Sequence, residues 1–159
     1  MALYLAQANL SRLRYPPGAP ELAEFTEAED RLNRLADRAP GFVWRLRTGL
    51  PADPRLILNI SIWKSYQPLH DYTYRSAHGH LVRRRHEWFD AITQPSTVLW
   101  WLPPDARPTP EDALARLTLL RRYGPAPRAF GLRTRFDPAG NRDPGRRRTA
   151  TGIREPGRW

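Results

Sequence analysis

Cysteine is absent from all 159 residues of the chain. Disulfide bonds, thiolate metal ligands and cysteine nucleophiles are therefore excluded, and nothing in the composition indicates an oxidising compartment. The sequence also lacks an apolar run long enough to cross a bilayer, and its N-terminus lacks the basic region and apolar core of a signal peptide. We therefore expect a cytoplasmic protein with no membrane partner.

Lysine is nearly absent as well, because Lys64 is the only one among 26 basic residues. The net charge of +10 raises the possibility of nucleic-acid binding, since clustered cations neutralise phosphates. However, residues 137–159 carry six arginines and three acidic residues, and the remaining charge is spread over the rest of the chain. Charge alone does not define a site, so we do not expect nucleic acid to be the partner.

The length and the aromatic content predict one domain with a substantial core. Six Trp, six Tyr and five Phe supply apolar area for that core. We assign residues 1–136 to the domain. Residues 137–159 are rich in Gly, Pro and Arg, and we expect them to form a disordered basic tail.

Periodicity and boundary residues predict alternating strands and helices. Strands are expected at residues 2–10, 42–48, 56–63 and 96–103, and an edge strand could follow at 128–134. Helices are expected from Pro20 to about residue 39, from about 65 to 91 with a break near "SAHG", and from Thr109 to Gly124. The last helix has a candidate capping box at Thr109 and Asp112 and a glycine stop.

This order predicts an α+β, ferredoxin-like β-α-β-β-α-β fold with an antiparallel sheet and an appended helix. Helices on one face of such a sheet leave its other face bare. Large residues such as Tyr4 or Trp100 would lie on that face, and an exposed apolar surface of this size usually finds a partner. We therefore expect a homodimer formed through the sheet face.

The stretch "YRSAHGHLVRRRHEWF" contains three of the four histidines. On a helical wheel, the apolar residues of this stretch share one arc with Tyr74, His78, Arg85 and Phe89, which predicts that this arc faces the sheet. The other two histidines fall on the opposite side or the flank and are expected to face water. A buried imidazole must hydrogen-bond or ligate something, so His78 is either a structural histidine or a pocket residue.

The pocket interpretation assigns His78, Tyr74 and Arg85 to catalysis. His78 would be a general acid or base, or alternatively the axial ligand of a haem. Strand 56–63 has one apolar face and one mixed face, and the mixed face supplies part of the expected substrate-binding set: Trp44, Asn59, Ser61, Trp63 and Phe89. We expect no metal site, since His78 has no carboxylate three or four residues further on and a His-x-His pair diverges on a helix.

The chain resembles, over about residues 3–134, the domain-of-unknown-function 3291 family, which is placed in the dimeric α+β barrel superfamily. The resemblance rests on the segments "PGFVWRL", "LNISIWKS", "YRSAHGHLVRRRHEWF", "VLWW" and "RPTPEDALARLTLLRRYGP". It implies a ligand site between the sheet and its helices. Superfamily relatives include cofactor-free monooxygenases, haem enzymes and polyketide cyclases or isomerases, and a fold shared by so many activities does not choose among them.

Three functions therefore remain open at the level of the sequence. The first is a small-molecule enzyme or binding protein, monooxygenase-like or isomerase-like, that acts on an aromatic or polycyclic substrate without a cofactor. The second is a haem protein with His78 as the axial ligand. The third is a non-catalytic module that binds a ligand or a nucleic acid.

Overall fold

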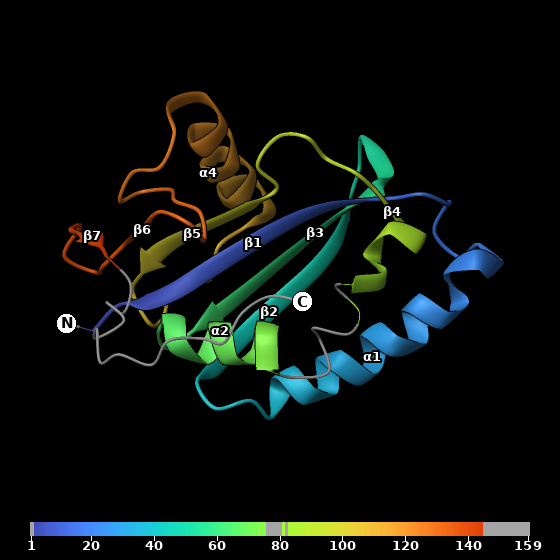
Figure 1. Ribbon diagram of the computed structural model, residues 1–159, viewed down its shortest axis with the longest axis horizontal. Helices are drawn as coiled ribbons and strands as arrows, with labels where there is room; N and C mark the ends of the chain where they lie inside the picture. The colour runs from blue at the N-terminus through green and yellow to red at the C-terminus, as the bar shows by residue number, and fades with distance from the viewer. Residues whose placement is uncertain (1, 76–80, 82, 145–159) are drawn as a thin grey trace, which may run out of the picture.

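The computed structural model describes residues 2–75, 81 and 83–144, and it places an antiparallel sheet at the centre of the molecule (Figure 1). The long strands run side by side in the order β2, β3, β1 and β5, and the short β4 continues the β5 edge along β1. The strands are β1 (Tyr4–Leu13), β2 (Phe42–Leu50), β3 (Asp53–Trp63), β4 (Phe89–Asp90) and β5 (Thr97–Leu102). The helices are α1 (Ala23–Asp37), α2 (Tyr66–Arg75) and α4 (Pro110–Tyr123), with 3-10 turns at Pro20–Leu22 and Arg85–Glu87.

The element order and the sheet order confirm the predicted ferredoxin-like α+β fold with an appended helix. β1 lies between β3 and β5 and pairs with both of them, so the first strand of the chain lies in the interior of the sheet. Two strands extend further than alternation alone predicts, since β1 continues to Leu13 and β3 begins at Asp53. No helix in the described part of the chain is both long and apolar enough to span a membrane.

Helix α4 begins and ends at the residues expected from its sequence. The Thr109 side chain accepts a hydrogen bond from the Asp112 backbone, and the Asp112 side chain accepts one from the Thr109 backbone. Pro110 occupies the first helical position, where a missing N–H costs nothing. Gly124 ends the helix with a φ of 77°, a conformation that residues with a Cβ rarely adopt.

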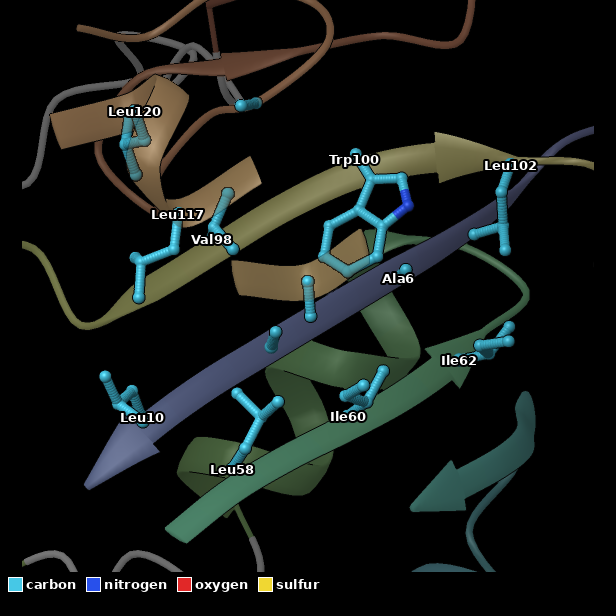
Figure 2. Close-up of a cluster of buried hydrophobic side chains, with 13 residues drawn as sticks. Ala6, Leu10, Leu58, Ile60, Ile62, Val98, Trp100, Leu102, Leu117 and Leu120 are labelled. Carbon is cyan, nitrogen blue, oxygen red and sulfur yellow. The ribbon is translucent and has the colours of Figure 1, made fainter. Parts of the chain in front are cut away.

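Helix α4 covers the face of the sheet that we expected to be bare (Figure 2). Ala113, Leu117 and Leu120 of α4 pack with the apolar side chains of β1, β3 and β5. Trp100 on this face is only 2% exposed. The expectation that the helices leave this face bare is therefore wrong, because the appended helix folds back over the sheet and buries Trp100.

The opposite face of the sheet packs against α1, α2 and the segment that ends at Phe89 (Figure 1). Phe25 of α1 packs with Trp88, and Leu69 of α2 packs with Trp63. The buried residues of α1 are Phe25, Leu32 and Ala36, whereas Leu35 lies outside this stripe and is 47% exposed.

The segment after α4 forms less regular structure than a fifth strand. Phe130 pairs with Leu99 in an isolated bridge, and the Leu99 and Phe130 backbones exchange two hydrogen bonds. A small sheet then joins β6 (Arg135–Phe136) to β7 (Arg142–Asp143), and it spans the expected boundary at residue 136. The division into a domain and a tail stays a prediction.

Candidate functional site

A cavity of about 240 Å³ lies between the sheet and the helices α1 and α2. Strands β1, β2 and β3 form its floor, α1 and α2 form two walls, and Leu81, Arg85, Trp88 and Phe89 close a third side. The cavity is lined by Gln7, Asn9, Ser11, Phe25, Glu29, Leu32, Asn33, Ala36, Phe42, Arg45, Leu46, Asn59, Ile60, Ser61, Trp63, Leu69, Tyr72, Thr73, Leu81, Arg85, Trp88 and Phe89.

The floor is polar because the strands alternate. On β1, the even-numbered residues from Ala6 to Leu10 enter the core under α4, which turns Gln7, Asn9 and Ser11 toward the cavity. Asn9 is the direct antiparallel partner of Asn59, and Gln7 is the partner of Ser61. The polar residues of β1 and β3 therefore lie side by side at the base of the cavity.

Most polar groups of the floor are hydrogen-bonded. Asn9 donates to the Thr97 hydroxyl (2.7 Å) and accepts from Ser11 (2.9 Å). Ser11 accepts in turn from Arg85 Nη2 at 3.3 Å. These bonds hold Asn9 and Ser11 in fixed orientations at the end of the cavity next to Arg85.

Two amides on the floor differ from these groups. Within residues 2–75, 81 and 83–144, no hydrogen bond is formed by the side chain of Gln7 or of Asn59. Both residues line the cavity and are half-buried. They therefore present donors and acceptors to the cavity that the described part of the protein does not use.

Aromatic side chains form much of the walls. The Phe25 ring lies 5.4 Å from Trp88 and 5.0 Å from Phe89, edge-on to the latter. Trp63 packs between Phe42 and Tyr72 and donates its indole N–H to Ser61 at 3.0 Å. A flat apolar molecule could pack against these rings.

Charged side chains lie on the side of the cavity formed by β2 and α1. Glu29 Oε1 accepts a hydrogen bond from Arg47 Nε at 2.6 Å, and the Glu29 side chain is only 18% exposed. Burial raises the pKa of Glu29, and Arg47 opposes this rise without cancelling it. Arg45 donates a hydrogen bond to the Asn33 carbonyl (2.6 Å) and forms an ion pair with Asp37. Burial also raises the pKa of the Tyr72 phenol.

The structure brings five of the predicted site residues to the cavity: Arg85, Asn59, Ser61, Trp63 and Phe89. Tyr74, predicted as catalytic, is 57% exposed and contacts the His70 ring instead of lining the cavity. Tyr74 lies on the side of α2 that carries His70, whereas Leu69, Tyr72 and Thr73 form the side that lines the cavity. His78 lies outside the described residues.

Trp44 lies on the other face of the sheet, where it packs against the core under α4. We expected Trp44 to line the pocket, but the structure places it elsewhere. The pairing of β2 with β3 has a register shift between Phe42 and Trp44. Because side chains alternate along a strand, this irregularity leaves Phe42 on the cavity side and turns Trp44 away from it.

The cavity also contains polar residues that were not predicted from the sequence, among them Gln7, Asn9 and Ser11 on β1 and Glu29 on α1. The residues of β1 could have been predicted, because Gln7 and Asn9 lie on a strand face that is otherwise apolar. Glu29 carries no such signal, because a glutamate on an amphipathic helix is normally a solvated residue.

The described residues do not fit a bound metal or a haem. Among residues 2–75, 81 and 83–144, no group of three or more histidine, aspartate or glutamate side chains could hold a metal ion. The described lining contains no histidine or methionine, and its volume of about 240 Å³ is small for a porphyrin. The haem alternative depends on His78 alone.

Three solved structures are similar to the chain at low sequence identity. A protein from Shewanella oneidensis has a TM-score of 0.52 at 9% identity, covering 64% of this chain and 93% of that chain. SnoaB from Streptomyces nogalater, described as a cofactor-independent oxygenase, has a TM-score of 0.48 at 16% identity, covering 69% and 98%. A conserved protein from Methanosarcina mazei has a TM-score of 0.49 at 16% identity, covering 64% and 92%. At 9% identity, the likeness to the Shewanella oneidensis protein shows the fold alone.

Sequence comparisons give one family and no individual relative. No curated protein sequence matches the chain. The family described as "Domain of unknown function (DUF3291)" matches residues 4–146, which is most of the chain and includes every described residue that lines the cavity. The chain therefore belongs to the DUF3291 family.

Proposed function

We propose that the protein binds a small aromatic molecule with oxygen substituents in the cavity between the sheet and α1 and α2. We further propose that it acts on this molecule in a monooxygenase-like or isomerase-like way. The cavity volume, the aromatic walls and the polar floor each support part of this proposal.

The unpartnered amides of Gln7 and Asn59 are the observation that carries the proposal. A half-buried amide that faces a cavity can bind water, and a ligand that displaces this water must supply a hydrogen bond in its place. A carbonyl or phenol oxygen of a ligand would supply that bond. An apolar pocket with a few convergent polar groups is the usual form of a small-molecule site.

The walls and the volume narrow the ligand further. Phe25, Trp88 and Phe89 offer ring faces and edges for a planar molecule. Ligand pockets usually measure about 300–1,000 Å³, so a cavity of about 240 Å³ favours one or two rings over a larger polycycle.

The reaction class follows from what the floor can stabilise. Removal of a proton beside a carbonyl places negative charge on the carbonyl oxygen, and amide N–H groups that point at that oxygen stabilise the charge. Such an enolate is the starting point of both an isomerisation and a reaction with dioxygen. His78 is proposed as the acid or base on the sequence argument alone.

Binding of 2-naphthol tests the proposal, because this compound has two rings and one oxygen. We expect saturable binding by calorimetry that weakens at least tenfold in Asn59→Leu, since leucine removes the amide and fills space. Gln94→Ala is the matched control, because Gln94 is an exposed amide outside the cavity. Absent binding to the wild type, or equal binding by Asn59→Leu, would contradict the proposal.

We also infer a homodimer through the sheet face that carries α4. Support comes from half-buried apolar residues of edge strand β2 that pack at the margin of this core, among them Trp44, Leu46 and Leu50. Light scattering at micromolar concentration should give twice the mass of one chain. A single-chain mass would refute the dimer and leave the ligand proposal intact.

A further inference from the structure

Glu29 is the only carboxylate among the described residues that line the cavity. We propose that Glu29 is the group that removes a proton from the bound molecule, at a carbon next to a ketone carbonyl. This inference rests on the proposed function and names both the base and a substrate class, a small ketone whose acidic C–H bond lies between an aromatic ring and the carbonyl.

Helix α1 places Glu29 where an apolar residue would be expected. Phe25, Leu32 and Ala36 of α1 also line the cavity, at the spacing of one helical face, so Glu29 belongs to the same stripe. Its side chain is 18% exposed. A carboxylate in this position is costly to bury, and a leucine would pack there without that cost.

Arg47 holds one oxygen of the carboxylate and leaves the other available. The bond from Arg47 Nε goes to Oε1 at 2.6 Å. In the part of the chain that the structure describes, no hydrogen bond is made to Oε2. The ion pair with Arg47 accounts for the contacts of Oε1. Oε2 accepts no hydrogen bond from the described residues, and a general base needs a carboxylate oxygen that can approach the substrate.

Arg47 also connects Glu29 to the polar floor, since Arg47 is the direct strand partner of Asn59. The carboxylate and the Asn59 amide therefore belong to neighbouring parts of one cavity. Burial raises the pKa of Glu29, which makes it a stronger base than a solvated glutamate.

The step balances without a further reactant. The Glu29 carboxylate takes the proton, the C–H electron pair becomes the C=C bond, and the carbonyl π electrons move to oxygen. The enolate oxygen then accepts a hydrogen bond from the Asn59 amide. The Glu29 carboxyl then exchanges its proton with solvent, and transfer of the solvent-derived proton to the same carbon completes an exchange, whereas transfer to another carbon of the enolate completes an isomerisation.

Exchange of the C1 protons of 2-tetralone in D₂O, followed by NMR, tests the inference. 2-Naphthol is the aromatic analogue of the enol of this ketone and reports binding separately. The wild type should accelerate exchange, and Glu29→Gln should lose about 100-fold or more of that acceleration while its affinity for 2-naphthol stays within about threefold. Glu27→Gln is the control, because Glu27 lies on the same helix, is 75% exposed and pairs with Arg31.

A second variant separates a base from a merely structural ion pair. Arg47 lowers the pKa of Glu29, so Arg47→Gln should move the acid limb of the exchange rate to higher pH. Glu29→Asp keeps a carboxylate and should retain part of the acceleration. Neither result follows if Glu29 only braces α1 against β2.

The possible outcomes distinguish this inference from the function on which it rests. Binding of 2-naphthol without accelerated exchange, full exchange activity in Glu29→Gln, or an unmoved acid limb in Arg47→Gln overturns the role of Glu29 alone. A wild type that does not bind 2-naphthol overturns both. Loss of exchange in Glu29→Gln with binding retained supports both.

Discussion

Asn9 and Asn59 face each other across β1 and β3 as antiparallel partners, yet their side chains have opposite roles. Asn9 donates to Thr97 and accepts from Ser11, which is 5% exposed. Asn59 has no hydrogen-bond partner among the described residues. One amide therefore organises the sheet, and the other is available to a ligand.

Replacement of these two residues should affect stability unequally. Asn9→Ala leaves the Ser11 and Thr97 hydroxyls without their partner, and we expect a loss of about 1–3 kcal/mol in the free energy of unfolding. Asn59→Ala breaks no described hydrogen bond and should cost less than about 1 kcal/mol. Urea unfolding of both variants measures the difference, and equal losses would show that Asn59 is structural.

The stability of a Trp100 variant shows whether α4 covers this face of the sheet in solution. The Trp100 ring is 2% exposed and belongs to the same cluster as Leu117. Trp100→Ala should destabilise the fold by about 3–5 kcal/mol, because it leaves a cavity under the helix. Leu35→Ala is the control and should cost less than about 1 kcal/mol, since Leu35 is 47% exposed. A small effect at Trp100 would mean that α4 does not cover this face.

Gly41, between α1 and β2, should not tolerate a larger residue. Its φ is +80°, and an added Cβ would lie 2.6 Å from the Cβ and Cγ atoms of Pro68. Gly41→Ala should therefore lower the free energy of unfolding by more than about 1 kcal/mol. Gly131→Ala meets nothing within 4 Å and has no positive φ, so thermal unfolding of the two variants should differ clearly.

Arg84 should make stability depend on pH and salt. It bonds to Glu24 at 2.7 Å and to Glu87 at 2.8 Å, and these hydrogen bonds lower the pKa of both carboxyls. Because the folded-state values lie below the unfolded ones, the gain is fully present above the unfolded value of about 4.3 and is lost as the pH falls through the folded values.

The stability difference between the wild type and Arg84→Gln should therefore shrink below about pH 4.3 and in high salt. A residual difference should persist at low pH, because the guanidinium also stacks on Trp88, 4.8 Å from its ring centroid. Arg83→Gln removes a neighbouring exposed arginine and should show no such pH dependence. A pH-independent difference would show that the ion pairs contribute nothing.

The sequence determined those features that local interactions specify. The capping box at Thr109, the stop at Gly124 and the alternation along β3 all depend on neighbouring residues, and each is found where the sequence predicts it. The element order was also readable, and it limits the fold to a few topologies.

Only the tertiary structure decided which surfaces meet. Periodicity shows that α4 has an apolar face, but not that this face covers Trp100. One register shift in β2 moved Trp44 out of the cavity, and pairing of β1 with β3 put Gln7 and Asn9 beside Asn59. Glu29 became a site residue because α1 packs over that floor. Such contacts join residues far apart in the chain, and the free energy that selects them comes from burial, which no local pattern specifies.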